Sequence, residues 1–172
     1  MKKGMYKLNK KRIAIYDLDN TLIDTEKLKE LRSKRDWKNI YDNFHLSYLN
    51  PKVRNYIDKL NKEIFIDFII VTSSPKIYAQ KLLNFHNFLN TSKIIGYHDT
   101  KLKKPNPEPY LKAIENIGSF DEIYIFGDQE SDFIAAERLK KILKQKIFKV
   151  GCSWYFKCKY SYLDREITLE EI

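Results

Sequence analysis

The sequence predicts a single α/β domain in which a central parallel sheet of about five strands lies between two layers of helices. Two observations support this prediction. Short apolar runs of strand length alternate along the 172 residues with segments whose apolar residues recur at helical spacing. Polar or acidic residues follow directly after three of those runs, where a parallel sheet collects its functional groups. Because such alternation produces right-handed crossovers that cover both faces of the sheet, we expect a Rossmann-like three-layer sandwich spanning residues 1–172.

The first strand is expected at Arg12–Tyr16, an isoleucine-rich run that leads into acidic residues. The charged segment Thr25–Tyr48 has a broken pattern, which favours short helices with a loop around Arg35–Asn43. Asn50 and Pro51 are typical of a helix start, with an N-cap followed by proline at the first helical position. Four apolar residues then follow at helical spacing: Val53, Tyr56, Ile57 and Leu60.

The rest of the chain continues the alternation of strands and helices. Four further apolar runs resemble buried strands: Ile64–Val71, Lys93–Gly96, Glu122–Phe126 and Lys146–Val150. The helix before the third strand is expected to turn four side chains inward: Ile77, Leu82, Phe85 and Leu89. A second helix is expected to begin at Asn106-Pro107 and to end at Gly118, and a third is marked by Phe133, Ala136, Leu139 and Leu143.

Composition narrows the class of protein. The longest apolar run, about Phe65–Val71, is too short to span a bilayer, and no secretory signal is evident, so we expect a cytoplasmic protein without membrane contact. Cys152 and Cys158 are expected to be reduced thiols, because no second cysteine pair or nearby histidine supports zinc. The net charge of +9 is compatible with nucleic-acid binding. However, the excess is almost all lysine rather than arginine, which an AT-rich genome would also produce. The lysines are also spread along the chain, apart from a cluster at Lys2–Arg12.

The chemistry begins after the first strand, at Asp17-Leu18-Asp19-Asn20-Thr21. Two carboxylates separated by one residue can take different catalytic roles. One can act as a nucleophile while the other transfers protons as a general acid and base, a combination that suits a covalent intermediate. Alone, this pattern is only suggestive, because acidic residues also cap helices and populate loops.

Other strand ends supply matching groups. Thr72 follows the second strand and offers a hydroxyl to a phosphoryl oxygen. Lys104, in a proline-rich turn before a helix, could neutralise both a nucleophile and a phosphate. The fourth strand leads through Gly127 to Asp128 and Asp132. So many acidic groups around one point would repel each other without a cation, and magnesium is the usual hard ion beside phosphate.

In this order and at these strand ends, the four segments resemble the four motifs of the haloacid dehalogenase superfamily. The resemblance covers Ile13 to about Val150, and Ile167–Ile172 also resembles the usual family ending. It implies that Asp17 attacks phosphorus and forms an aspartyl-phosphate. It implies that Asp19 protonates the leaving oxygen and then deprotonates the hydrolytic water. An acid at position 19 also favours phosphoryl transfer over dehalogenation, because halide leaves without a proton.

The resemblance also assigns the binding groups. Thr72 and the amide of Ser73 would hold the phosphoryl oxygens, and Lys104 would balance charge. Mg²⁺ would lie between Asp17, the backbone carbonyl of Asp19 and Asp128, with Asp132 acting directly or through water. This ion would shield the phosphate's charge from the attacking carboxylate.

Members of this superfamily usually carry a cap domain that selects the substrate. Residues 24–50 provide room only for a reduced helical cap inserted after the first strand, so we expect a comparatively open site. The favoured function is a Mg²⁺-dependent phosphomonoesterase acting on a small phosphorylated metabolite. Lys104–Tyr110 with Gly127–Asp132 resemble small-molecule phosphatases of the phosphoglycolate phosphatase type.

Two alternatives stay open. A nucleic-acid end-processing 3′-phosphatase would use basic and aromatic residues of the insert, where Arg35-Asp36-Trp37 with Asn50-Pro51 resembles the phosphatase part of phage polynucleotide kinases. For the insert we favour instead a lid helix with Trp37 and Phe44 packed onto the body. The second alternative is a non-catalytic binding module, and the complete set of motif residues argues against it. The substrate and the oligomeric state stay undetermined by the sequence.

Overall fold

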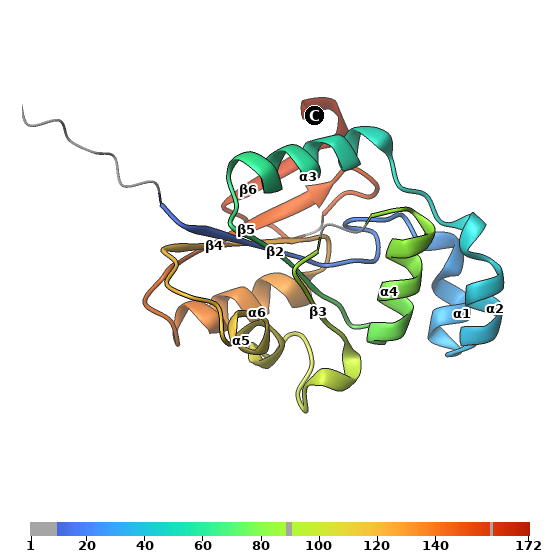
Figure 1. Ribbon diagram of the computed structural model, residues 1–172, viewed down its shortest axis with the longest axis horizontal. Helices are drawn as coiled ribbons and strands as arrows, with labels where there is room; N and C mark the ends of the chain where they lie inside the picture. The colour runs from blue at the N-terminus through green and yellow to red at the C-terminus, as the bar shows by residue number, and fades with distance from the viewer. Residues whose placement is uncertain (1–9, 89–90, 159) are drawn as a thin grey trace, which may run out of the picture.

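The computed structural model describes residues 10–88, 91–158 and 160–172, which form a six-stranded sheet flanked by helices (Figure 1). The strand order is β3-β2-β1-β4-β5-β6, and all neighbouring strands are parallel. The strands are β1 (Arg12–Tyr16), β2 (Asp67–Val71), β3 (Lys93–Ile95), β4 (Glu122–Gly127), β5 (Lys146–Ser153) and β6 (Arg165–Thr168). The predicted α/β sandwich is therefore confirmed. Most of the basic cluster Lys2–Arg12, and Leu89, lie outside the described residues.

Helices cover both faces of the sheet. Figure 1 shows α3 (Pro51–Glu63) above the sheet and α5 (Glu108–Ile114) and α6 (Glu130–Lys140) below it. Strand β1 is buried on both faces, because Ala14 and Tyr16 join the core under α3 and α4 (Lys76–Phe85), whereas Ile13 and Ile15 join the core under α5 and α6. The chain builds β1, β2 and β3 outward and then returns to the other side of β1 for β4. This reversal places the carboxyl ends of β1 and β4 at the point where such sheets bind ligands.

The sheet has one strand more than the five expected. The extra strand, β6, is four residues long and pairs with β5 at the edge of the sheet. Only Ile167 is buried in it, while Arg165 and Glu166 are exposed. A short polar edge strand carries too little apolar alternation to be recognised in the sequence.

Two helices differ from the expected pattern. In α4, Ile77 and Phe85 are 60% and 50% exposed, so the prediction that they point inward is wrong, whereas Leu82 is buried as expected. The buried face instead includes Tyr78, whose hydroxyl has a polar partner described below. Helix α5 ends at Ile114, four residues before the predicted stop at Gly118.

The segment 24–50 forms four short helices, as expected for its broken pattern. One of them lies within Arg35–Asn43, so the prediction of a loop there is wrong. The elements are η1 (Glu26–Leu28), α1 (Lys29–Ser33), α2 (Trp37–Asp42) and η2 (Phe44–Leu46). Helix α2 forms within the expected loop because the Asp36 carboxylate caps it, accepting the backbone N–H of Asn39 at 3.4 Å. The ring centroids of Trp37 and Phe44 lie 5.8 and 5.9 Å from that of Tyr78, so both residues pack against α4. No helix in the described ranges is long and apolar enough to cross a bilayer.

Candidate active site

The first candidate residues follow β1 in a tight reversal of the chain. The amide of Asp17 donates to the carbonyl of Phe126 at 2.9 Å, which continues the pairing of β1 with β4 and holds Asp17 at the sheet edge. Asn20 takes a left-handed conformation with φ of 61°, which asparagine tolerates better than most residues. Its side-chain oxygen accepts the N–H of Thr25 at 3.0 Å. This turn carries Asp19 to a different set of partners from those of Asp17.

Lys104 joins Asp17 to Asp132. Its Nζ lies 2.7 Å from a carboxylate oxygen of each and donates to the carbonyl of Val71 at 3.2 Å. The side chains are almost fully buried, at 4% exposure for Lys104, 7% for Asp17 and 0% for Asp132. Burial by itself would lower the pKa of Lys104, but the two carboxylates outweigh it and the pKa is raised. Lys104 is therefore a fixed positive charge beside the predicted nucleophile.

Asp17, Asp128 and Asp132 converge on one point. One carboxylate oxygen from each lies within 4.8 Å of the others, and all three residues belong to the buried side of the site. Burial raises the pKa of Asp17, and the charges of Asp132 and Asp128 raise it further, while Lys104 opposes the shift. Three carboxylates in so small a space favour a divalent cation with oxygen ligands, which would stabilise their ionised forms.

One carboxylate oxygen of Asp132 is buried without a hydrogen-bond donor among the described residues. Its Oδ1 accepts from Lys104 and, at 2.9 Å, from the buried hydroxyl of Tyr110, whereas its buried Oδ2 has no hydrogen-bond partner among the described residues. A Cβ at position 127 would lie 2.6 Å from that Oδ2, so glycine is needed there for the carboxylate to fit. An unsatisfied buried carboxylate oxygen is costly, and a bound Mg²⁺ would satisfy it. The donor set therefore fits the predicted metal.

The end of β2 supplies the predicted phosphate-binding groups. The amide of Thr72 donates to the carbonyl of Ile95 at 2.9 Å and extends the pairing of β2 with β3. The buried Thr72 hydroxyl accepts the N–H of Ser74 at 3.0 Å, and Ser73 is exposed between them. Thr72 and Ser73 line the same pocket as Asp17 and Lys104. The predicted phosphate-binding residues and the predicted nucleophile therefore line one pocket.

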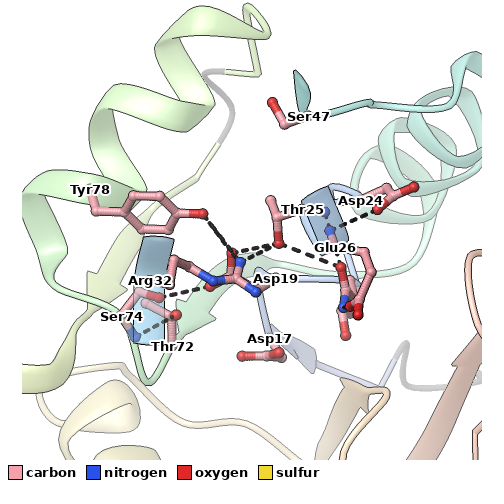
Figure 2. Close-up of polar contacts among 12 residues, drawn as sticks. Asp17, Asp19, Asp24, Thr25, Glu26, Arg32, Ser47, Thr72, Ser74 and Tyr78 are labelled. Atoms are coloured by element: carbon pink, nitrogen blue, oxygen red, sulfur yellow. Dashed lines mark hydrogen bonds and ion pairs between the residues drawn. The ribbon is translucent and has the colours of Figure 1, made fainter. Parts of the chain in front are cut away.

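Asp19 lies in a separate network that Figure 2 shows in close-up. Its Oδ1 accepts from the hydroxyls of Thr25 and Tyr78 at 2.8 and 2.7 Å, and its Oδ2 accepts from the Ser74 hydroxyl at 2.7 Å. Arg32 from α1 also donates to Oδ1 and forms an ion pair with it. The side chain of Asp19 is therefore outside the carboxylate cluster, and the metal contact expected of this residue concerns its backbone carbonyl.

One pocket of about 560 Å³ brings these parts together. Five of the predicted site residues line it: Asp17, Asp19, Thr72, Ser73 and Lys104. The other two, Asp128 and Asp132, are within the carboxylate cluster beside Asp17. The insert and the loop after β3 complete the wall with Lys29, Arg32, Arg35, Trp37, Tyr97 and His98.

Several contacts were not anticipated from the sequence. Tyr78 and Tyr110 each donate to a site carboxylate, although both occupy helix positions that look like ordinary core. The hydroxyl of Thr21, in the turn after β1, donates to Asp128 at 3.1 Å. Burial raises the pKa of Tyr110, and Asp132 raises it further, so the phenol stays protonated and can donate. No local pattern identifies these residues, because their partners are distant in the sequence.

Comparison with known proteins decides the family. The model of the family described as haloacid dehalogenase-like hydrolase matches residues 28–141, a segment that begins after Asp19. The chain belongs to this family. A phosphoglycolate phosphatase from Aliivibrio fischeri is 28% identical over 118 residues, which cover 67% of this chain and 51% of that protein. The pyrophosphatase PpaX from Oceanobacillus iheyensis is 24% identical, covering 74% of this chain and 79% of that protein. The chain thus spans about half the length of the first of these relatives.

Solved structures of this family share the fold. A haloacid dehalogenase-like hydrolase from Bacteroides fragilis has a TM-score of 0.73 at 18% identity, covering 94% of this chain and 99% of that chain. A β-phosphoglucomutase structure from Thermotoga maritima has a TM-score of 0.71 at 17% identity, covering 93% and 95%. At such identities the likeness concerns the fold. The predicted family and fold are confirmed.

Proposed function

We propose that this haloacid dehalogenase-like hydrolase is a Mg²⁺-dependent phosphomonoesterase that forms an aspartyl-phosphate on Asp17. The observation that carries the proposal is the buried convergence of Asp17, Asp128 and Asp132, with Lys104 2.7 Å from both Asp17 and Asp132. Transfer of a phosphoryl group to an anionic carboxylate requires three things at one point: the nucleophilic carboxylate, a fixed positive charge and oxygen ligands for a metal ion.

Each group would have a defined role. Asp17, Asp128, Asp132 and the backbone carbonyl of Asp19 would hold Mg²⁺, which would neutralise phosphoryl charge when bound. An oxygen of Asp17 would attack phosphorus while the bond from phosphorus to the ester oxygen breaks. Asp19 would give that oxygen a proton, and would later take a proton from the water that cleaves the aspartyl-phosphate. The product would be inorganic phosphate, with both aspartates restored.

The remaining groups would orient the phosphoryl group. The Thr72 hydroxyl and the Ser73 amide would donate to its oxygens, and Lys104 would offset its charge. The hydroxyls of Thr25, Ser74 and Tyr78 would fix the Asp19 carboxylate, because all three already donate to it.

A small substrate is favoured over a nucleic-acid end. The pocket of about 560 Å³ is in the range of small-molecule sites. The similar proteins named above are a phosphoglycolate phosphatase and a pyrophosphatase, and both names denote small phosphorylated substrates. We propose further that residues 24–50 act as a reduced cap on a single domain, since α1 and α2 supply one wall of the pocket.

The test is phosphate release from sugar phosphates, nucleotides, carboxylated phosphomonoesters and 3′-phosphorylated oligonucleotides, with Mg²⁺ present or chelated. The proposal expects Mg²⁺-dependent release that Asp17→Asn abolishes, with a small substrate turned over fastest. Fastest release from the oligonucleotides, with binding that weakens steeply with salt, would identify a nucleic-acid phosphatase instead. Release from no substrate above that of Asp17→Asn would refute catalysis and favour a binding module.

A further inference from the structure

The guanidinium of Arg32 contacts Asp19 through only one of its three nitrogens. Its Nη1 donates to Asp19 and Thr25 and lies 3.4 Å from the hydroxyl of Tyr78. The side chain is 15% exposed and lines the pocket, and its Nε and Nη2 make no hydrogen bond to any described residue. These two nitrogens share one edge of the planar guanidinium, which is the edge that binds a carboxylate or phosphate through two parallel hydrogen bonds. Arg32 therefore lines the pocket and keeps one two-donor edge that no hydrogen bond to a described residue occupies.

Arg35 lies at a position that normally suits glycine. Helix α1 ends with the N–H of Arg35 donating to Arg32 and that of Asp36 donating to Leu31, both at 3.0 Å. These bonds define a Schellman motif in which residue 35 takes a left-handed conformation, with φ of 55°. A side chain at such a position is strained relative to glycine, because its Cβ crowds the backbone. Arg35 nevertheless carries a long cationic side chain, which lines the pocket.

The charges around the pocket are not balanced. Four cations line it, Lys29, Arg32, Arg35 and Lys104, against the two carboxylates Asp17 and Asp19. Lys104 pairs with Asp17 and Asp132, Arg32 with Asp19, and Lys29 with Glu26 at 2.9 Å. Arg35 has no ion pair with any described residue. The unpaired positive charge is therefore on the insert, away from the groups that would hold the phosphoryl group.

We propose that Arg32 and Arg35 form a second anion subsite, and that the substrates are small phosphomonoesters carrying another anionic group, a carboxylate or a second phosphate. This proposal rests on the proposed function and specifies its substrate class. Arg32 would keep its Nη1 on Asp19 and offer its Nε and Nη2 edge to the second anion. Arg35 would add its charge at the mouth of the pocket, and Trp37, half-buried against Tyr78, would flank the connecting chain of the substrate. The second anion would thereby set the position of the ester oxygen relative to Asp19.

Binding measured by calorimetry in the Asp17→Asn background tests the subsite without turnover. Mg²⁺ is present, and the ligands are a carboxyalkyl phosphate, a bisphosphate and a hydroxyalkyl phosphate of the same chain length. The first two should bind at least roughly tenfold more tightly than the third, as expected for one or two hydrogen bonds to a charged group. Whichever of the two binds more tightly identifies the second group.

The variants separate this subsite from general effects of charge. Arg35→Gln and Arg32→Lys should each reduce the preference by roughly tenfold. Lys34→Gln is the matched control, because Lys34 is on the same insert, pairs with Glu30 at 2.5 Å and does not line the pocket, so the preference should persist. Arg35→Gly should lose the preference while raising Tm by a few degrees, because glycine relieves the left-handed backbone.

The outcomes distinguish this proposal from the proposed function. Equal binding of the three ligands, with no change in Arg35→Gln, overturns the second anion subsite even if the wild type releases phosphate. An equal loss of preference in Lys34→Gln also overturns it, since charge anywhere on the insert would then suffice. A preference that depends on Arg32 and Arg35 supports the subsite, whereas absence of phosphate release by the wild type refutes only the catalytic function.

Discussion

Replacing Lys104 with methionine should leave two buried carboxylates facing each other without a cation. Lys104 Nζ lies 2.7 Å from both Asp17 and Asp132, and its side chain is 4% exposed. Methionine fills a similar volume but removes the charge. Removing one partner of a buried ion pair costs about 3–5 kcal/mol, because the charges left behind are desolvated. In a chain of this size, each kcal/mol corresponds to about 2–4 °C, so Tm should fall by about 10 °C in the presence of a chelator.

Mg²⁺ should recover part of that loss, because the ion would bind the same carboxylates. An ion present at 100 times its dissociation constant stabilises the folded state by about 2.7 kcal/mol. Thermal unfolding of wild type and Lys104→Met with Mg²⁺ or chelator measures both effects. Lys62→Met, at an exposed lysine of α3, is the control and should change Tm little. A fall in Tm no larger than that of the control, or a Tm of Lys104→Met that Mg²⁺ does not raise, would refute this account of the carboxylate cluster.

Two further predictions concern glycine 127 and a buried glutamate. Gly127→Ala should lower the affinity for Mg²⁺ roughly tenfold or more and destabilise the folded protein by about 1–3 kcal/mol, because the added Cβ would lie 2.6 Å from Asp132 Oδ2. Mg²⁺ titration tests this. Gly118→Ala is the control, because a Cβ at position 118 would have no atom within 4 Å. Burial would raise the pKa of Glu122, but hydrogen bonds from Lys10 and Arg12 lower it to about 2, below its ordinary 4.5. The stability it contributes is therefore present above pH 4.5 and lost as pH falls towards 2. Glu122→Gln should cost about 2 kcal/mol at pH 7 and little near pH 2 in urea unfolding; an equal cost at both would contradict the assignment.

The central strands were predictable because burial on both faces produces continuous apolar runs. Strand β1 was expected at Arg12–Tyr16 and is found there. The edge of the sheet was not predictable, since β6 contributes only Ile167 to the core. Helix α2 was missed because its start depends on the Asp36 cap rather than on an apolar stripe.

The sequence indicated the catalytic residues at the strand ends more clearly than the residues that donate hydrogen bonds to them. Asp17 and Asp128 follow strands directly, so their meeting at one edge follows from the topology of a parallel sheet. The donors to Asp19 were not predictable, because Arg32 and Tyr78 come from two different helices and meet only through the packing of the insert on α4. Tertiary contacts of this kind leave no local signal in the sequence.

Direct detection of a phosphoryl group on Asp17 tests the central claim most directly. Asp19→Asn should slow cleavage of the intermediate, and an aryl phosphate supplies a leaving group that departs without a proton. The protein would be mixed with this substrate and Mg²⁺, quenched, reduced with borohydride and analysed by peptide mass spectrometry. The account predicts homoserine at position 17, formed by reduction of the aspartyl-phosphate, and none in Asp17→Asn. Phosphate release that persists in Asp17→Asn, with no modification at position 17 in Asp19→Asn, would contradict it.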